Sequence, residues 1–159
     1  MEEVSLRPIR DEDREFLFRV YAGTRAEELA QVADWTPEQK EAFLRMQFDA
    51  QHAYYQEHYR TADFQVVLAE GEPVGRLYLD RWEAEHRIVD IAILPEHRNR
   101  GFGTVLLREI LEEADLAGKP VSIHVEIHNP ARKLYDRLGF VRVEDRGVYV
   151  LMRRPVGGG

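Results

Sequence analysis

The spacing of apolar residues in the N-terminal third of the chain predicts one strand and two helices. Val4–Pro8 has the length and pattern of a short strand. A helix is expected from a cap at Asp11 to about Ala22, because apolar residues recur there near helical spacing. The segment Thr36–Gln39 supplies a capping threonine, a proline at the first helical position and a glutamine three residues after the cap. It predicts a helix to about Tyr59 that is apolar on two sides and is therefore partly buried or covers a substrate groove.

After Asp63 the pattern changes to strands that alternate with shorter helices. The expected elements are a hairpin of Phe64–Ala69 and Val74–Leu79, a strand His86–Leu94, a helix Gly103–Ala117, a strand Val121–Ile127, a helix Pro130–Leu138 capped by Asn129, and a closing hairpin of Val141–Asp145 and Val148–Met152. This order predicts a mixed α/β fold without repeats or linkers. We expect a single domain over residues 1–155, followed by a flexible tail at 156–159.

Composition and charge narrow the class of protein. The 159 residues, 44% hydrophobic and 32% charged, suit one soluble globular domain. A net charge of −7 disfavours nucleic acid or an anionic membrane as a general partner. The N-terminus lacks the basic and apolar regions of a signal peptide and no run is long enough to span a membrane, so a cytoplasmic location is expected by default.

The rarity of nucleophilic side chains excludes several kinds of chemistry. The chain has no cysteine, which rules out disulfides, thiolate catalysis and cysteine-ligated metals. Its two serines, Ser5 and Ser122, do not lie in the Gly-x-Ser-x-Gly segment of a serine hydrolase. Any reaction is therefore expected to proceed without a covalent intermediate on the protein.

The most specific segment is a basic, glycine-containing loop between the strand that ends at Pro95 and the following helix. Helix-start amides and the positive end of the helix converge there, and Arg98 and Arg100 add cationic donors, so the loop is suited to an anion. Gly101 and Gly103 allow close approach of the backbone to a pyrophosphate. The loop lacks both the P-loop lysine and the third glycine of a dinucleotide-binding fingerprint. Taken alone, the two glycines favour a tight strand-to-helix turn over a phosphate site.

A second segment, Asn129–Phe140, places Tyr135 in a short helix beside the end of a strand. Together with Arg98-x-x-Gly101-x-Gly103, it resembles the two motifs of the GCN5-related N-acetyltransferase (GNAT) superfamily. The two motifs cover the C-terminal half of the chain, and the first half agrees only in element order. The resemblance implies a central, mixed but mostly antiparallel sheet flanked by helices. It also implies transfer of an acetyl group from acetyl-CoA, without a metal, to a primary amine of a small molecule or peptide.

The resemblance also implies roles for particular residues. Main-chain groups of Ile91 and Ile93 would pair with the pantetheine arm, and Asn129 would contact the cofactor or cap its helix. Tyr135 would protonate the departing thiolate. Its alternative role is that of a packing residue in an amphipathic helix. The pyrophosphate would be held by the loop and helix start, which comprise Arg98, Asn99, Arg100, Gly101, Phe102, Gly103 and Thr104.

The general base is the least defined part of the predicted site. His124 lies five residues before Asn129 and could accept the amine proton near neutral pH, or it could be a structural strand histidine. His124, Glu126 and His128 alternate along the predicted strand, so they would lie on one face and could bind a metal ion. No further ligand is identifiable. Two alternatives to an N-acetyltransferase remain open. The protein could be a non-catalytic acyl-CoA-binding regulatory module, or an acyltransferase that uses another acyl group or a hydroxyl acceptor. The sequence leaves open whether the protein forms a homodimer.

Overall fold

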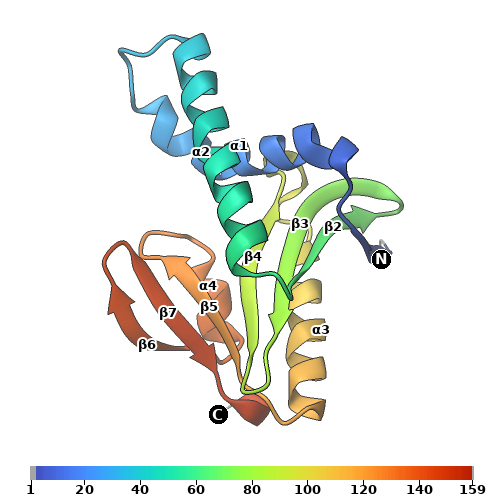
Figure 1. The fold of residues 1–159 in the computed structure, drawn as a ribbon. Coiled ribbons are helices and arrows are strands. Elements are labelled where there is room, and N and C mark those ends of the chain that lie inside the picture. The colour runs from blue at the N-terminus through green and yellow to red at the C-terminus, as the bar shows by residue number, and fades with distance from the viewer. Residues whose placement is uncertain (1–2, 159) are drawn as a thin grey trace.

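A mixed seven-stranded sheet forms the frame of residues 3–158, which the computed structural model describes (Figure 1). The strand order is β1-β2-β3-β4-β5-β7-β6, and all neighbours are antiparallel except β4 and β5. The strands are β1 (Val4–Pro8), β2 (Asp63–Ala69), β3 (Glu72–Arg81), β4 (His86–Ile93), β5 (Val121–Glu126), β6 (Val141–Arg146) and β7 (Tyr149–Arg154). The predicted fold class is confirmed.

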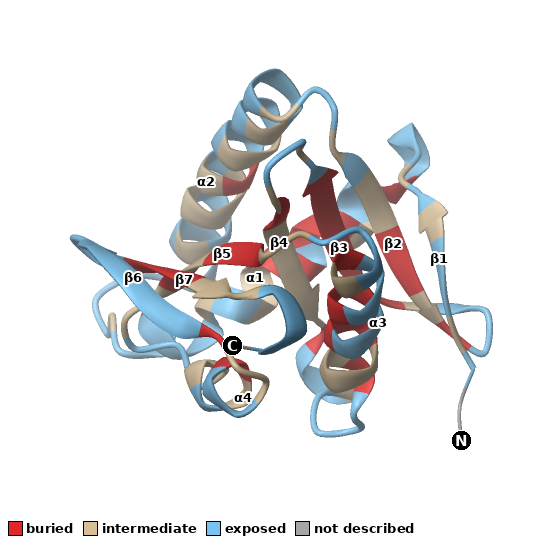
Figure 2. Cartoon of the chain, turned by 90° about the horizontal axis from the view of Figure 1, so that it is seen from below, coloured by how far each residue is buried: buried red, intermediate tan, exposed pale blue. Residues whose placement is uncertain are grey.

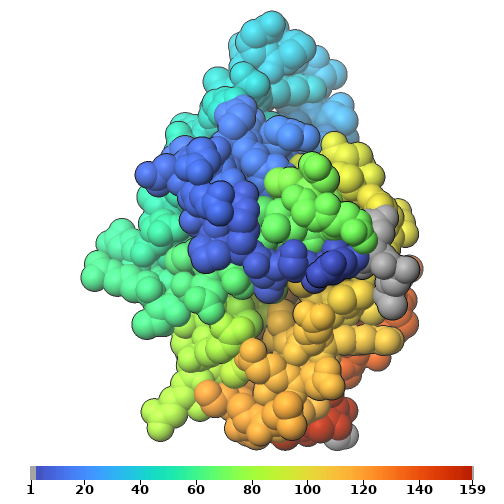
Figure 3. All heavy atoms as spheres, turned by 90° about the vertical axis from the view of Figure 1, so that its right-hand side faces the viewer, coloured from blue at the N-terminus to red at the C-terminus, as the bar shows by residue number. Residues whose placement is uncertain are grey.

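Helices cover both faces of this sheet. They are α1 (Arg14–Ala30), α2 (Pro37–His58), α3 (Phe102–Leu116) and α4 (Arg132–Arg137). Leu77 and Leu79 of β3 join the core formed with α3, whereas the alternate residues Arg76 and Tyr78 contact α2. The α1–α2 connection projects beyond the sheet, as Figures 1 and 3 show.

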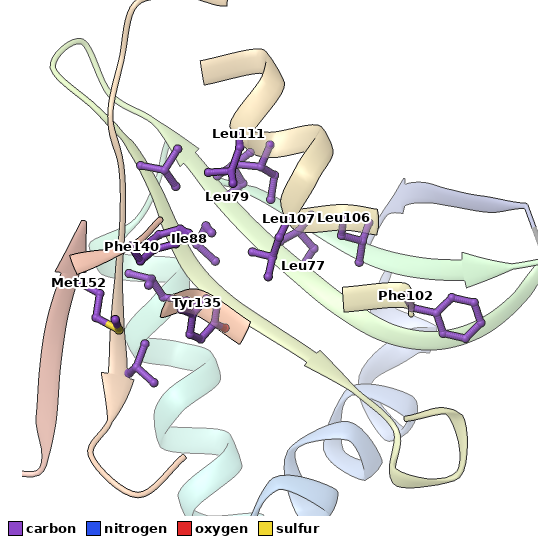
Figure 4. Close-up of a cluster of buried hydrophobic side chains, with 14 of the residues drawn as sticks. Leu77, Leu79, Ile88, Phe102, Leu106, Leu107, Leu111, Tyr135, Phe140 and Met152 are labelled. Atoms are coloured by element: carbon purple, nitrogen blue, oxygen red, sulfur yellow. The ribbon is translucent and has the colours of Figure 1, made fainter. Parts of the chain in front are cut away.

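The main core lies between the sheet and α3. Leu106, Leu107 and Leu111 of α3 pack with Leu77 and Ile88 of the sheet (Figure 4). Only this side of α3 is buried, as Figure 2 shows. The core continues to α4 and β7, since Tyr135 of α4, Phe140 and Met152 of β7 belong to the same cluster.

A separate cluster joins α1 and α2. The buried residues Leu17, Phe18 and Tyr21 of α1 surround Phe48 of α2, and the rings of Phe18 and Phe48 meet edge to face at 5.8 Å. The predicted capping box of α2 is confirmed, because Thr36 Oγ1 accepts a hydrogen bond from the amide of the third helical residue.

The parallel strands β4 and β5 part after a short paired segment. His86–Ile88 pairs with Val121–Ile123, and no pairing follows in the described residues. The partners of β4 in β3 also shift, since Tyr78 lies opposite Asp90 and Leu79 lies opposite Ile88. Val89 is therefore the extra residue of a β-bulge. Beyond it, the edge of β4 that faces β5 has no strand partner, and Figure 1 shows the two strands diverging.

The start and length of α1 differ from the prediction. A short 3-10 helix over Asp11–Asp13 precedes α1, and the carboxylate that accepts the Arg10 amide belongs to Asp13 rather than to Asp11. The helix runs to Ala30 instead of about Ala22. It continues because later residues such as Leu29 are buried, so tertiary packing stabilises a segment whose own pattern is weak.

The C-terminal part of the chain also differs from the prediction. The helix expected over Pro130–Leu138 is shorter, Arg132–Arg137. Residues Val156–Gly158, expected as part of a flexible tail, form a short 3-10 helix, and the Gly157 amide donates to Asp115 Oδ1 at 2.8 Å. Residue 159 lies outside the described residues. No helix within residues 3–158 combines the length and the apolar character needed to span a membrane.

Candidate active site

A cavity of about 140 Å³ lies where β4 and β5 part. Its walls come from β4 at Val89–Ala92, from β5 at Ile123–Glu126 and from side chains of α1 and α2. Three of the predicted site side chains line it, those of His124, Asn129 and Tyr135, and Ile91 lines it too. The divergence of the two parallel strands therefore brings the Asn129–Tyr135 segment and the α1–α2 pair to one site, whereas the basic loop at 98–104 does not line this cavity.

Tyr135 is placed by α4 on the wall of this cavity. Its side chain is only 4% exposed, and its ring packs against Phe140 with the centroids 5.5 Å apart. Burial raises the pKa of Tyr135 above its ordinary value, and the negative charge of Asp90 raises it further. The phenol is therefore protonated at neutral pH and is able to donate a proton.

Asn129 forms the turn that leads into α4. Its Oδ1 accepts a hydrogen bond from the Ala131 amide at 2.9 Å, and its carbonyl accepts one from the Arg132 amide at 3.1 Å. Asn129 thus caps the turn that precedes α4, which begins at Arg132. The residue also lines the cavity.

His124 lies between two arginines. Its Nδ1 is 3.3 Å from Arg87 Nη1, and its Nε2 is 3.2 Å from Arg146 Nη1. A neutral imidazole has one acceptor nitrogen, so only one of these contacts is a hydrogen bond at a time. Burial, followed by the charges of Arg87 and Arg146, lowers the pKa of His124. The histidine is therefore neutral at pH 7, with a guanidinium beside each ring nitrogen.

The three residues that suggested a metal site, His124, Glu126 and His128, do not all lie on one strand. β5 ends at Glu126, so His128 lies beyond the strand. Glu126 forms an ion pair with Arg25 of α1 at 2.8 Å. Across residues 3–158, no group of three or more His, Cys, Asp or Glu side chains is arranged to hold a metal ion.

Asp90 is the site residue that the sequence prediction missed. It lies on β4 directly after the bulge, and its Oδ2 accepts hydrogen bonds from Arg76 Nη2 at 2.8 Å and from the Tyr55 hydroxyl at 3.0 Å. Arg76 also donates to Gln51 of α2 at 2.9 Å. The available signal was a charged residue flanked by apolar residues in the middle of each of two neighbouring strands, Arg76 in β3 and Asp90 in β4, a pattern typical of a cross-strand ion pair.

The main chain of β4 presents Ile91 and Ile93 to the side that β5 leaves open. The Leu94 amide donates to the Val74 carbonyl of β3, so alternation directs the main-chain groups of Ile91 and Ile93 away from β3. The Ile93 carbonyl accepts a hydrogen bond from Arg98 Nε at 3.1 Å, which agrees with this direction. An extended ligand could pair with this edge as a missing strand would.

The basic loop leaves the start of α3 uncapped. Asn99 and Gly101 have positive φ angles of 63° and 83°, and no side chain of residues 3–158 accepts a hydrogen bond from the first amides of α3. A Cβ atom added at Gly101 or at Gly103 would meet no atom within 4 Å. Space is therefore open beside Gly101 and Gly103 at the positive end of a 15-residue helix, whose first turn includes Phe102 and Thr104.

The two loop arginines are already engaged within the protein. Arg98 donates to the carbonyls of Ile93 and, at 3.2 Å, Gly23, so it ties the loop to β4 and α1. Arg100 Nη1 lies 2.9 Å from His97 Nδ1, and its guanidinium lies over the Phe102 ring at 5.0 Å. Both positive charges thus stay near the helix start, and Arg98 in addition sets the position of the loop.

The fold and this site define the class of protein. Residues 28–140 match the model of the acetyltransferase (GNAT) family, and the chain belongs to that family. It is 37% identical over 79 residues to the mycothiol acetyltransferase of Amycolatopsis mediterranei, a match that covers 48% of this chain and 26% of that relative. The matched segment thus spans about a quarter of the relative's length.

Solved structures share the fold over nearly the whole chain. The PaiA N-acetyltransferase from Thermoplasma acidophilum, solved in complex with coenzyme A, superposes with a TM-score of 0.69 at 17% identity and covers 95% of this chain and 98% of its own. An acetyltransferase from Thermus thermophilus has a TM-score of 0.67 at 23% identity and covers 98% and 99%. At these identities the likeness concerns the fold.

Proposed function

We propose that the protein is an N-acetyltransferase that moves an acetyl group from acetyl-CoA to a primary amine by direct attack. The observation that carries this proposal is one continuous path. An uncapped helix start lies beyond the end of β4, an unpaired edge of β4 leads from it, and a protonated tyrosine lines the cavity beside that edge. The coenzyme A complex of the Thermoplasma relative, which has the same fold, supports the choice of donor.

The chain's own groups would position the donor substrate along this path. The first amides of α3 and the charges of Arg98 and Arg100 would bind the pyrophosphate. The main-chain groups of Ile91 and Ile93 would pair with the amide groups of the pantetheine arm. Asn129 lies next to Tyr135 on the cavity wall and would contact the same arm.

Two side chains would then handle the protons of the reaction. The uncharged amine attacks the thioester carbonyl carbon, a carbon–nitrogen bond forms and the carbon–sulfur bond breaks. Tyr135 would donate its proton to the leaving thiolate, and His124 would accept the proton that the amine loses. The lowered pKa of His124 keeps it neutral at pH 7 and thus able to accept a proton.

Two measurements test this function. Calorimetric titration with CoA should show binding, and acetyl-CoA with a panel of primary amines should release free thiol in step with amine acetylation. Absence of CoA binding would refute the proposal. The second candidate is a non-catalytic acyl-CoA-binding module, favoured by the two arginines that flank His124. CoA binding without transfer to any amine would support that alternative.

A further inference from the structure

His124 lies between two guanidinium groups that cannot both donate a hydrogen bond to it. Arg87 Nη1 is 3.3 Å from Nδ1 of the ring, and Arg146 Nη1 is 3.2 Å from Nε2. A neutral imidazole has one acceptor nitrogen and one N–H group, so in either tautomer one guanidinium N–H faces a ring N–H. Two donors side by side are suited to an anion, which can accept a hydrogen bond from both.

Arg87 is the fixed member of this arrangement. It is buried, and its Nε donates to Ser122 Oγ at 2.8 Å while its Nη2 donates to Glu85 Oε2 at 3.5 Å. Its guanidinium also lies over the ring of Trp82 at 4.7 Å. These contacts hold Arg87 in one place within the protein, so a ligand has to approach His124 from the other side of the ring.

Arg146 is the guanidinium on that other side. It is the last residue of the outer strand β6, and its side chain is 49% exposed (Figure 1). Its Nη2 donates to Glu144 at 3.1 Å, in an exposed ion pair of a kind that contributes little to stability. Its Nη1 faces the His124 ring. Arg146 can therefore shift toward a ligand at small cost.

The contact between Arg146 and His124 lies beside the cavity. His124 lines the cavity, and so does Tyr149, which is directly opposite Arg146 on β7. The acidic residue of this part of the wall, Glu126, is already paired with Arg25 at 2.8 Å. An anion bound by Arg146 would thus lie next to the side chain that is proposed to take the proton of the amine.

That proton transfer creates a need for negative charge at the same point. Once His124 has accepted a proton, an imidazolium lies between two guanidinium groups. The carboxylates near the ring are Glu85 and Glu144, and they are already paired with Arg87 and Arg146. Burial lowers the pKa of His124, and the two arginines lower it further. A further anion beside Arg146 would stabilise the imidazolium.

We propose that the acceptor carries a carboxylate, and that Arg146 binds this group beside His124. The inference rests on the proposed function and names a second group of the acceptor in addition to its amine. Two adjacent donors match the two oxygens of a carboxylate, whereas a phosphate would bring a third oxygen without a partner. Arg146 acts as a specificity residue, and the bound carboxylate assists the proton transfer to His124 by compensating its charge.

Binding is tested with butyrate as the probe and butyramide as its neutral analogue. Each is added to the full-length protein saturated with CoA and followed by NMR. Butyrate should bind more tightly and should raise the pKa of His124, which butyramide should not. Arg146→Gln should weaken butyrate roughly 10-fold, near the lower end for a hydrogen bond to a charged group because the side chain is half exposed. Arg142→Gln is the matched control, since Arg142 lies on the same strand, is equally exposed and is opposite Met152 of the core.

Transfer assays distinguish a carboxylate of the acceptor from a separate carboxylate ligand. With acetyl-CoA, ω-amino acids of increasing chain length are compared with their amides. The best amino acid should have a kcat/KM about 10-fold above that of its amide, and Arg146→Gln should abolish this preference.

Three results would overturn the proposal. They are equal binding of butyrate and butyramide, unchanged butyrate affinity in Arg146→Gln, and transfer to amides or other uncharged amines that is as fast as transfer to the amino acids. The last result, with butyrate binding intact, would mean that the site holds a separate anion. Absence of CoA binding, or of transfer to any amine, would instead count against the proposed function.

Discussion

Replacement of Tyr135 by phenylalanine tests the proton-donating step with little disturbance of the fold. The hydroxyl forms no hydrogen bond with residues 3–158, and the ring contact with Phe140 is kept. The free energy of unfolding should therefore change by less than about 1 kcal/mol. CoA affinity should change by no more than a factor of about two, because the proposed pyrophosphate and pantetheine contacts involve other groups.

The size of the rate effect follows from the acidities involved. A thiol has a reference pKa of about 8.5 and a phenol of about 10, and burial raises the pKa of Tyr135 further. Complete proton transfer from the phenol to the thiolate is therefore unfavourable, and the thiolate leaves readily by itself. We expect a loss near the lower end of the range for general-acid catalysis, about 100-fold in kcat or about 2.7 kcal/mol.

The assay is thiol release from acetyl-CoA with an amine that the screen has identified. Tyr54→Phe is the matched control, since Tyr54 is an exposed tyrosine of α2 that stacks on His58. Because the pKa of Tyr135 lies above its usual range, the unmodified enzyme should lose no rate by tyrosine ionisation below about pH 10. An unchanged kcat in Tyr135→Phe would remove this residue from the mechanism.

Three further changes test the packing and the titrating groups. Gly23→Ala would normally stabilise a helix by about 1 kcal/mol, but its Cβ would lie 2.7 Å from Pro95 Cδ, so urea unfolding should show a loss of about 1–3 kcal/mol. Asp13 has a lowered pKa through its hydrogen bonds with Arg7, so its stabilisation is present above the unfolded pKa of about 3.9 and is lost as the pH falls through the folded value. Asp13→Asn should therefore be less stable at pH 7 and depend less on pH between 5 and 2, as acid titrations of unfolding would show. His124 has a lowered pKa, so kcat/KM should stay level down to about pH 6.5 and fall only at lower pH. If the His124→Gln variant shows the same fall at low pH, the histidine is excluded as the proton acceptor.

Local signals in the sequence were sufficient for most of the fold. The capping box at Thr36 marks the start of α2 because its hydrogen bonds lie within a few residues. The length of α1 could not be predicted in the same way. Beyond Ala22 the helix contains Gly23, which is a poor helix former, yet the absence of a Cβ there lets Pro95 pack closely against it. The contact that justifies this glycine comes from a loop far away in the sequence.

The predicted site was incomplete for a related reason. Tyr135 and the loop around Gly101 belong to motifs that can be recognised as contiguous segments. Arg76 and Asp90 meet only because β3 and β4 pair in one particular register, and they are diagonal rather than directly opposite neighbours. The sequence shows a charge in the middle of each strand, but pairing the two charges requires the register.

The bulge at Val89 determines which side of the sheet receives each group of β4. Strict alternation would place Asp90 on the same face as Ile88, in the apolar core under α3. The extra residue shifts the later positions by one, so that Ile91 and Ile93 pack toward α3 while Asp90 faces α2. The signal is present in the sequence as a spacing of three between Ile88 and Ile91 followed by a spacing of two. One inserted residue thus has two effects, because the α3-facing side chains keep the core closed while the Asp90 carboxylate lies at the cavity, beside Tyr55 of α2.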